Sequence, residues 1–389
     1  MKQICFFNEF MYKRYLSIGE IVKETSLFLF GARKTGKSTY LKTVFPDAAY
    51  IDLLDSSVRK VYKNTPSALY EQFASGTVKT VIIDEVTEVP ELLNEVHRLI
   101  FKNGTGFILC ASSARKLRRK GTNTLGGRAF PSYLYPLVSA EIPDFDIEHA
   151  LTVGMIPDHY LSANPQILLS AYIDVYLQQE IKAEAIVRNV DAFEKFMEVA
   201  ALTDGEVVNY SNIANDCGVK SNTIKEYFSI LEDTLIGYMI PAYHKSLKRK
   251  EFQAPKFYYF DVGVVNYLLN RRELHRGTSE YGHAFEHFIM QERIAYLGYT
   301  RSRERLSYWH TYSGSEVDAV IGNKIAIEIK SVDMVRSKHI SGLRSFLGEY
   351  SGFRAILVSF DPITRITEDN IELMYVHDFL NQLWAGKLL

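Results

Sequence analysis

Residues 31–38 read Gly-Ala-Arg-Lys-Thr-Gly-Lys-Ser and directly follow the apolar run 27–30, Leu-Phe-Leu-Phe. This stretch matches the G-x-x-x-x-G-K-[ST] pattern of a phosphate-binding loop between a strand and a helix. Its two glycines are expected to adopt backbone angles that a Cβ would penalise, so that backbone N–H groups surround an anion. Lys37 is expected to reach the β- and γ-phosphates, and the Ser38 hydroxyl to bind Mg²⁺. The alternative is a glycine-rich turn that matches by chance.

A second motif begins at Thr80 and reads Thr-Val-Ile-Ile-Asp-Glu-Val. Its apolar residues predict a buried parallel strand, which places Asp84 and Glu85 at the carboxyl end, where open α/β sheets hold ligands. Asp84 is expected to hold Mg²⁺ through water, and Glu85 to polarise the water that attacks the γ-phosphate. Alternatively, the acidic pair ends a strand and caps the next helix.

Two later elements extend the predicted site. The run 107–111 ends in Ser112 and Ser113. A polar residue there would sit between the two previous strands and sense the γ-phosphate, unless the serines only end the strand. Arg128 follows Gly126 and Gly127. It would either stabilise phosphoryl charge, in cis or from a neighbouring subunit, or be an ordinary surface arginine.

In this order the motifs resemble a prokaryotic AAA+ (P-loop) ATPase family whose members carry a C-terminal domain of formerly unknown function. The resemblance covers nearly the whole chain and rests on residues 31–38, Asp84-Glu85, Ser112-Ser113, Gly127-Arg128 and 136–141. It implies ATP and Mg²⁺ as cofactors and ATP hydrolysis as the activity.

The resemblance also assigns the nucleotide contacts, with two departures from the family pattern. The family's first loop proline is Ala32 here, and its Gly-Gly-x-Pro element, whose proline is expected to pack near adenine, reads Gly-Met-Ile-Pro at 154–157. The second departure affects the adenine site and not the phosphate site. The residues expected to contact the nucleotide are Gly31, Ala32, Arg33, Lys34, Thr35, Gly36, Lys37, Ser38, Thr39 and Pro157.

Composition limits the classes of protein to which the chain could belong. Its 389 residues predict two or three domains, and 47% hydrophobic residues are ample for packed cores. The net charge of −1 excludes polyanion binding by bulk charge, so any DNA surface must be a local patch. Cys5, Cys110 and Cys217 are scattered, which disfavours disulfides or zinc and suits a reducing cytoplasm. No signal peptide and no apolar run of about 20 residues are present, so no membrane association is expected.

The middle of the chain predicts a helical lid followed by a winged helix. In the lid, a helix over 166–183 would bury one face made of Ile167, Leu168, Ala171, Tyr172, Val175 and Tyr176. The winged helix would comprise a short helix capped by Ser211, a turn at Gly218, a helix over 223–233 capped by Ser221 or Asn222, and strands over 235–241 and 256–261.

The functional interpretation of the winged helix is duplex DNA binding. The second helix would enter the major groove with Lys220, Asn222 and Lys225, beside a basic wing over 245–250. A packing or partner-docking module is the alternative. A second basic cluster, 115–120, would either contact nucleic-acid phosphates or form a solvated loop.

The last third contains a second group of charged residues. A predicted helix over 281–297 carries Glu286, and predicted strands over 307–312, 316–321 and 325–330 carry Asp318, Glu328 and Lys330. These residues, in this order, resemble the PD-(D/E)XK nuclease fold, and a helix over 337–346 and a strand over 354–359 continue the usual fold order. The resemblance implies that Asp318 and Glu328 bind Mg²⁺, Lys330 positions or activates water, and Glu286 adds or orients a ligand. The alternative is a noncatalytic module with salt bridges on an exposed strand.

Hairpin geometry tests this interpretation. A two-residue turn at Gly322-Asn323 would pair Asp318 with Ile327 and turn it away from Glu328. A three-residue turn or a bulge would instead place both carboxylates on one face. An even, unbulged hairpin would therefore count against the nuclease hypothesis. His283 and His287, which flank Glu286, are interpreted as surface or core-edge histidines.

The sequence thus predicts an α/β chain in four parts: a P-loop parallel sheet over 1–145, a helical lid over 146–190, a winged helix over 191–260 and a restriction-endonuclease-like domain over 261–389. Its expected function is a cytoplasmic ATPase switch coupled to a DNA-binding winged helix and a metal-dependent DNA endonuclease domain. The rival hypotheses are an ATP-dependent regulator with an inactive nuclease fold and a chaperone-like remodeller of a partner. DNA is the expected partner, a homo-oligomer is an open alternative, and the sequence identifies no protein partner.

Overall fold

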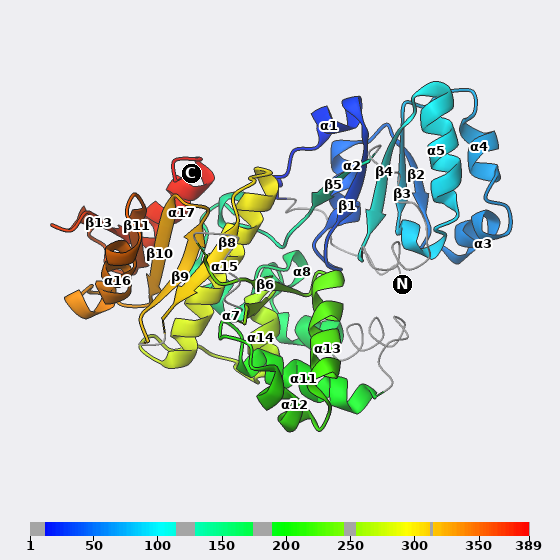
Figure 1. The fold of residues 1–389 in the computed structure, drawn as a ribbon. Coiled ribbons are helices and arrows are strands. Elements are labelled where there is room, and N and C mark those ends of the chain that lie inside the picture. Colours follow the sequence, from blue (N-terminus) through cyan, green and yellow to red (C-terminus); the bar gives the residue numbers. More distant parts are fainter. Residues whose placement is uncertain (1–11, 114–128, 174–188, 245–253, 312–313, 389) are drawn as a thin grey trace.

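The computed structural model describes residues 12–113, 129–173, 189–244, 254–311 and 314–388. In it the chain forms an N-terminal module with one sheet, a largely helical middle module and a C-terminal module with a second sheet (Figure 1). The two larger sheets lie on opposite sides of the molecule, and the middle module lies below and between them in this view. The fold is thus mixed α/β, as the sequence predicts.

The N-terminal module is a parallel sheet with the strand order β2-β3-β4-β1-β5. Its strands β1, β3 and β4 are almost wholly buried, which explains their continuous apolar sequences. The elements are α1 Gly19–Glu24, β1 Ser26–Phe30, α2 Lys37–Val44, β2 Ala49–Asp52, α3 Ser56–Asn64, α4 Ala68–Phe73, β3 Thr80–Asp84, the 3₁₀ turn η1 Val86–Glu88, α5 Leu92–Asn103, β4 Gly106–Ala111, β5 Ala129–Tyr133 and the 3₁₀ turn η2 Ser139–Glu141.

The middle module consists of short helices and one antiparallel hairpin, β6–β7. Gly218, with φ +66°, makes the turn between α12 and α13 as expected, but Asn209 and not Ser211 caps α12. The elements are α7 Ile147–Val153, α8 Pro157–Tyr160, α9 Pro165–Ser170, α11 Val190–Leu202, α12 Tyr210–Cys217, α13 Ser221–Asp233, β6 Gly237–Ile240, β7 Lys256–Tyr259 and α14 Val262–Leu268.

The face predicted for the lid helix is wrong in its first turn. Ile167 is 69% exposed and Leu168 37% exposed, whereas Leu169, Tyr172 and Ile173 are buried. The helix α9 begins at Pro165, and its buried stripe is rotated by about one residue from the predicted one. The predicted face also included Val175 and Tyr176, which lie outside the described residues.

The C-terminal module is a mixed sheet with the order β12-β13-β11-β10-β9-β8. Strands β8, β9 and β10 form an antiparallel meander, and β11 then pairs parallel to β10 after the crossover through α16. The long helix α15 runs beside this sheet (Figure 1). The elements are α15 Ser279–Tyr299, β8 Leu306–His310, β9 Glu316–Ile321, β10 Ile325–Lys330, the 3₁₀ turn η4 Ser337–Ile340, α16 Ser341–Glu349, β11 Arg354–Ser359, β12 Arg365–Ile366, β13 Ile371–Tyr375 and α17 Val376–Trp384.

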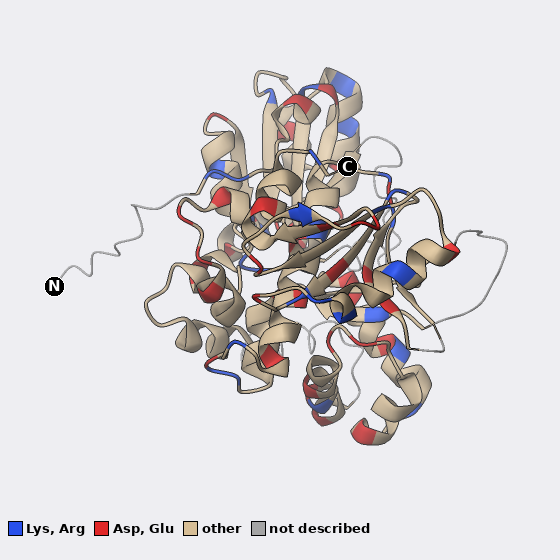
Figure 2. Ribbon diagram, turned by 90° about the vertical axis from the view of Figure 1, so that its left-hand side faces the viewer, with Lys and Arg blue, Asp and Glu red and all other residues tan. Residues whose placement is uncertain are grey.

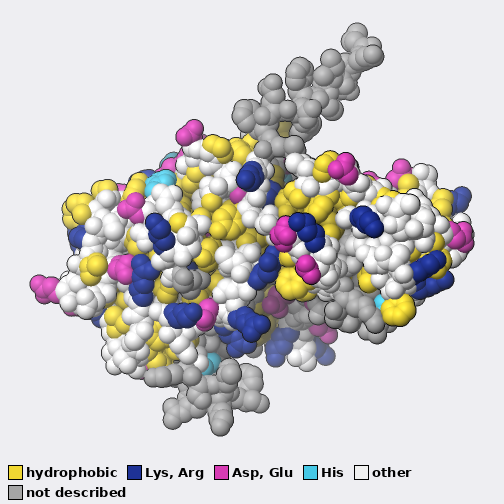
Figure 3. Space-filling view, turned by 90° about the horizontal axis from the view of Figure 1, so that it is seen from above, with side chains coloured by type: hydrophobic (Ala, Val, Ile, Leu, Met, Phe, Trp, Pro, Cys, Tyr) yellow, Lys and Arg dark blue, Asp and Glu magenta, His cyan; other side chains and the backbone are white. Residues whose placement is uncertain are grey.

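Charged side chains are distributed over all three modules. Acidic and basic positions are scattered over the ribbon in Figure 2. On the face seen in Figure 3 both kinds are interspersed with apolar side chains. Among the described residues, no helix is both long and apolar enough to span a membrane.

Candidate functional site

The phosphate loop joins β1 to α2, in the predicted strand–loop–helix context. Gly36 is the residue before α2 and has φ +90°, a conformation that favours glycine. Gly31 is required for a different reason than expected, because its φ is not positive and a Cβ built there would lie 2.5 Å from the Leu134 carbonyl oxygen. Besides Gly36, Lys34 also adopts a left-handed backbone conformation in this loop, with φ +71°.

The Lys37 ammonium group is buried inside the loop. Its Nζ donates to the carbonyl oxygens of Gly31, at 2.7 Å, and Ala32, at 3.1 Å. Burial lowers the pKa of Lys37, partly offset by Cys110, Glu85 and Asp84. The cation is thus held by backbone carbonyls at the place where a phosphate chain would pass.

Ser38 and Asp84 converge at the side where the metal is expected. Ser38 Oγ donates to Asp84 Oδ2 at 2.6 Å, and the Tyr50 hydroxyl also donates to this carboxylate oxygen. A hydroxyl and a carboxylate in contact are the oxygen donors that suit Mg²⁺. The residues therefore fit the metal that an ATP site needs. Tyr50 was not foreseen, because a lone tyrosine in β2 gives no signal in the sequence.

Glu85 is held at the end of β3 with φ +55°. Its carboxylate accepts a hydrogen bond from the Thr87 hydroxyl, and from Ser112 N at 3.4 Å and Ser112 Oγ at 3.2 Å. The strand β4 lies between β3 and β1, as predicted, and this order brings Ser112 beside Glu85. Of the two serines, Ser112 therefore contacts the acidic pair, while Ser113 Oγ donates to the Asp233 carbonyl of the middle module at 3.2 Å.

The middle module closes one side of the loop. A Cβ built on Gly36 would lie 3.9 Å from Pro157 Cγ, and Lys34 Nζ forms an ion pair with Asp158 at 2.8 Å. Pro157 thus adjoins the phosphate loop, while its contact with adenine stays a prediction. Two other expected contact residues are exposed: Arg33 within the loop and Thr39 in the first turn of α2.

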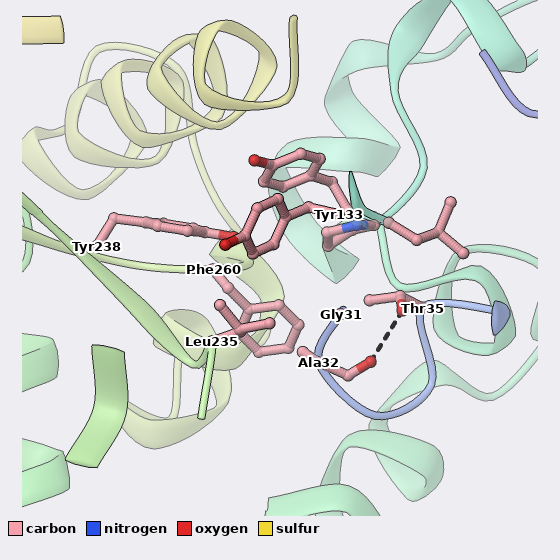
Figure 4. A pocket seen from close by; sticks show the side chains of 10 residues that line it. Gly31, Ala32, Thr35, Tyr133, Leu235, Tyr238 and Phe260 are labelled. Carbon is pink, nitrogen blue, oxygen red and sulfur yellow. Dashed lines mark hydrogen bonds between the residues drawn. The ribbon is translucent and has the colours of Figure 1, made fainter. Parts of the chain in front are cut away.

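A small pocket lies where the loop meets the middle module (Figure 4). The side chains of Tyr133, Tyr238, Leu235 and Phe260 come from β5, β6 and the segments beside them, and they surround the Gly31–Ala32 backbone. Within the loop, Thr35 Oγ1 donates to the Ala32 carbonyl at 2.8 Å. The phosphate loop therefore packs directly against aromatic residues of the middle module.

Three predicted basic elements lie outside the described residues. These are Arg128, the cluster 115–120 and the wing 245–250. Their predicted roles remain predictions.

The second group of charged residues assembles on one face of the C-terminal sheet. The β9–β10 register pairs Ile321 with Ile325 and Ala319 with Ile327, so the connection is the three-residue turn. This register places Asp318 opposite Glu328, as the nuclease hypothesis requires. Asp318 and Glu328 are 2% and 5% exposed, while the side chain of Lys330 remains 36% exposed.

Short contacts tie this carboxylate cluster together. Lys330 Nζ lies 2.6 Å from Glu328 Oε1 and 3.6 Å from Asp318 Oδ2. Asp318 Oδ2 also accepts from Ile329 N at 2.6 Å, while Glu328 Oε2 is buried without a hydrogen-bond partner among the described residues. Burial raises the pKa of Glu328 well above its usual range, and the nearby Asp318 adds to the effect. Burial and Glu286 likewise raise the pKa of Asp318.

Lys256 is the component that the sequence did not reveal. It starts β7 in the middle module, is 3% exposed, lies 3.6 Å from Glu286 Oε1 and forms an ion pair with Glu316. Burial lowers the pKa of Lys256, but Glu286, Asp318 and Glu316 outweigh burial and raise it overall. Glu286 also accepts from the Tyr258 hydroxyl at 2.6 Å. The middle module thus contributes a cation to the C-terminal carboxylates.

The donor set of this cluster is limited. Within the described ranges, no three His, Cys, Asp or Glu side chains are grouped so that they could hold a metal. Asp318 and Glu328 supply two carboxylates, and Glu286 is engaged by Tyr258 and Lys256. The cluster therefore fits a metal held by two carboxylates and not one held by three.

The histidines beside Glu286 differ from one another. His283 is half exposed, whereas His287 is 2% exposed and its Nδ1 lies 2.6 Å from Asp204 Oδ2. Interpreting His287 as a surface or core-edge residue was wrong, because it is buried against a carboxylate of the middle module.

Comparisons with known proteins divide the chain in the same order. Residues 23–142 match a family model described as an AAA domain, residues 144–275 match a domain of unknown function, DUF8612, and residues 281–377 match another, DUF4143. With the parallel sheet and its loop, the first match gives the chain an AAA-type P-loop ATPase domain, followed by a DUF4143 domain.

Individual relatives are distant. Two proteins described as uncharacterized, from Mycobacterium bovis and Mycobacterium tuberculosis, are each 21% identical over 267 residues, which is 66% of this chain and 59% of theirs. The chain therefore spans less than two thirds of the length of these relatives. A solved structure of Pif1 helicases, described as the basis for DNA unwinding at forked double-stranded DNA by two coordinating copies, matches with 13% identity and a TM-score of 0.25, covering 42% of this chain and 52% of that one.

Proposed function

We propose that the chain is a Mg²⁺-dependent ATPase whose nucleotide state controls a DNA-binding unit and the carboxylate cluster of the C-terminal module. The observation that carries this proposal is the contact between Ser38 Oγ and Asp84 Oδ2 at 2.6 Å, beside the buried Lys37 and the oriented Glu85. These groups have the chemistry that ATP hydrolysis needs.

Each residue has a distinct role in this mechanism. Lys37 binds the phosphates, and Ser38 and Asp84 hold Mg²⁺, which neutralises phosphate charge when bound. Glu85 orients and polarises the attacking water, and Ser112 fixes the carboxylate for this task. Arg128 is proposed to stabilise phosphoryl charge, from a neighbouring subunit if the chain forms a homo-oligomer.

ATP hydrolysis by the purified chain tests the proposal. Lys37→Ala should abolish hydrolysis and weaken nucleotide binding, because the buried cation is lost. The matched control is Lys63→Ala, which removes an exposed lysine from α3 in the same module. Equal activity of Lys37→Ala and Lys63→Ala would refute the ATPase proposal.

The DNA-binding unit is proposed to be a winged helix. The order α11, α12, α13 and the hairpin β6–β7 suits that fold, and Lys220, Asn222 and Lys225 are exposed at the start of α13. Fluorescence anisotropy with a labelled DNA duplex tests it. The double variant Lys220→Ala/Lys225→Ala should weaken binding and lower its salt dependence.

A packing role is the alternative for the same unit, and one observation favours it. Tyr243 N donates to the Tyr308 carbonyl at 2.6 Å, and the Tyr308 hydroxyl donates to the Ala254 carbonyl at 2.5 Å. Tyr243 follows β6 and Ala254 precedes β7, so the hairpin is hydrogen-bonded to β8 on both sides of its connection. Unchanged DNA affinity of the double variant would support this alternative.

For the C-terminal module we propose a PD-(D/E)XK nuclease-like fold. The helix α15, the meander β8–β10, the crossover through α16 and the parallel strand β11 agree with that order, and Asp318, Glu328 and Lys330 share one face. The active form would hold Mg²⁺ through Asp318 and Glu328, with Lys330 positioning water. The alternative is an inactive fold in a regulator, and it is favoured by Lys256, whose buried ammonium group already pairs with Glu286 and Glu316 beside the cluster.

Cleavage of supercoiled, linear and branched DNA with Mg²⁺ or Mn²⁺ separates these alternatives. Loss of cleavage in Lys330→Ala would establish the nuclease, and Lys37→Ala would show whether ATP controls it. Intact ATPase activity without cleavage would support the regulator. ATPase stimulation by a protein and not by DNA would instead indicate a remodeller. The boundaries 1–145, 146–190, 191–260 and 261–389 remain predictions that limited proteolysis can test.

A further inference from the structure

Arg14 is hydrogen-bonded both to the phosphate loop and to the segment that follows β5, although no motif contains it. It lies before α1, and its side chain is 7% exposed. Its Nη1 donates to the Thr35 carbonyl at 2.7 Å, and its Nη2 donates to the carbonyls of Tyr135 at 2.7 Å and Pro136 at 3.1 Å. One guanidinium therefore joins the phosphate loop to the segment that follows β5.

The surroundings of Arg14 keep it charged and fixed. Its Nε donates to Glu141 Oε2 at 2.8 Å, and Glu141 in turn accepts from Tyr15 N at 2.6 Å and Val138 N at 3.2 Å. Arg14 Nη2 also donates to the Tyr299 hydroxyl at 3.2 Å. Burial lowers the pKa of Arg14, but Tyr299 and Glu141 outweigh it and raise the pKa overall.

The contact with Thr35 has a consequence for anion binding. The Thr35 carbonyl and the Gly36 N–H belong to one planar trans peptide, so they point in opposite directions. Holding the carbonyl toward Arg14 therefore points the Gly36 N–H away from Arg14. In loops of this pattern the backbone N–H groups surround the bound phosphates. Gly36 has φ +90° and no Cβ, so this peptide lacks the steric restraint of an ordinary residue.

We propose that Arg14 is a positioning residue of the nucleotide site: it fixes the Thr35–Gly36 peptide so that the Gly36 N–H is available to phosphate. The inference rests on the proposed ATPase and assigns to Arg14 a role in substrate affinity and not in the chemical step. Through Tyr299, at the end of α15, the same guanidinium also ties the loop to the C-terminal module.

Arg14→Lys is the informative variant. It keeps a cation beside Glu141, so the carboxylate is not left unpaired, but one ammonium group cannot reproduce the fork that reaches Glu141 and Thr35 together. We expect KM for ATP to rise on the order of 10- to 100-fold, because one charge-assisted contact to phosphate is lost. We expect kcat to change by less than about threefold, since Lys37, Asp84 and Glu85 are untouched. Lys13→Gln, which removes the exposed neighbouring cation, should match the wild type.

The outcomes separate this inference from the ATPase proposal. A folded Arg14→Lys chain with wild-type KM would overturn the inference alone, and so would an equal loss in kcat. If Arg14→Lys does not fold, Tyr299→Phe is the deciding variant, because it keeps the ion pair between Arg14 and Glu141. It should raise KM for ATP about twofold to tenfold. An unchanged KM in Tyr299→Phe would also overturn the inference. A wild-type chain that neither binds nor hydrolyses ATP would overturn both.

Discussion

Ser113, the second residue after β4, donates a hydrogen bond of 3.2 Å from its Oγ to the carbonyl oxygen of Asp233, the last residue of α13. Its neighbour Ser112 contacts the proposed catalytic carboxylate of Glu85. Adjacent residues of one strand end thus touch the proposed site of hydrolysis and the helix proposed to read DNA.

Ser113→Ala should therefore uncouple DNA from ATP hydrolysis. The change removes the contact with Asp233 but leaves Lys37, Asp84 and Glu85 in place, so basal ATPase activity should stay within about threefold of the wild type. Stimulation by DNA should fall, and ATP should shift DNA affinity less, because coupling is reciprocal. Ser112→Ala is the matched control, and it should slow basal hydrolysis. Unchanged coupling in Ser113→Ala would show that the contact carries no signal.

Glu85→Gln should separate nucleotide binding from hydrolysis. The amide cannot polarise water as a carboxylate does, so the rate should fall by a factor of about 10² to 10⁴ while ATP still binds. Hydrogen exchange of the trapped chain then tests the proposed motion of the middle module. Residues 205–260 should change their exchange rates when ATP is added, and identical rates with and without ATP would argue against a switch.

Local sequence patterns predicted much of the fold. The strands β9 and β10 have the predicted bounds, because short runs rich in apolar residues on either side of a glycine turn are typical of strands. Ser38 and Asp84 lie together because the carboxyl ends of parallel strands share one edge of a sheet. The sequence could not decide between a two-residue turn and a three-residue turn or bulge in the β9–β10 hairpin, because Gly322 suits either connection.

Contacts between modules were not predictable. Arg14, Lys256 and Asp204 each contact a residue of α15 that lies at least 30 positions away in the sequence, and each is a single charged residue without a motif. A pattern of spacings describes neighbours within one element, whereas these pairings depend on how separate modules dock. The exposure of Ile167 was missed because α8 and α14, which pack against α9 within the middle module, decide which face of α9 is buried.

Lys256→Gln should make the C-terminal cluster responsive to metal. Removing the ammonium leaves Glu286 and Glu316 without their cation, and breaking a buried ion pair typically costs about 3 to 5 kcal/mol of stability. A divalent cation should recover part of this loss, so Mg²⁺ or Mn²⁺ should raise the melting temperature more in Lys256→Gln than in the wild type. Lys324→Gln, which removes a more exposed partner of Glu304 on the same sheet, is the control. Equal responses to metal in all three chains would show that Lys256 does not compete with a cation.

Glu292 should make the stability of the chain depend on pH. Burial raises the pKa of Glu292 to about 7, although Trp384 Nε1 at 2.5 Å and Ser139 at 2.8 Å donate to its carboxylate. The folded pKa then lies above the unfolded value of about 4.3, so this contribution is fully present below that value and is lost as pH rises toward 7. The loss should not exceed about 1.4 kcal/mol per pH unit.

Urea unfolding at intervals between pH 4.5 and 8 measures this slope, and comparison with Glu292→Gln isolates it from other titrating groups. The glutamine does not titrate, so the difference in unfolding free energy between wild type and variant should change between about pH 4.5 and 7 and be constant above. Its amide also meets the Trp384 indole N–H, which shifts the absolute stability equally at every pH and leaves the slope informative. Glu368→Gln, at an exposed position, should run parallel to the wild type. A constant difference between the wild-type and Glu292→Gln profiles over the whole range would mean that Glu292 is already ionised at low pH, and that its three donors outweigh burial.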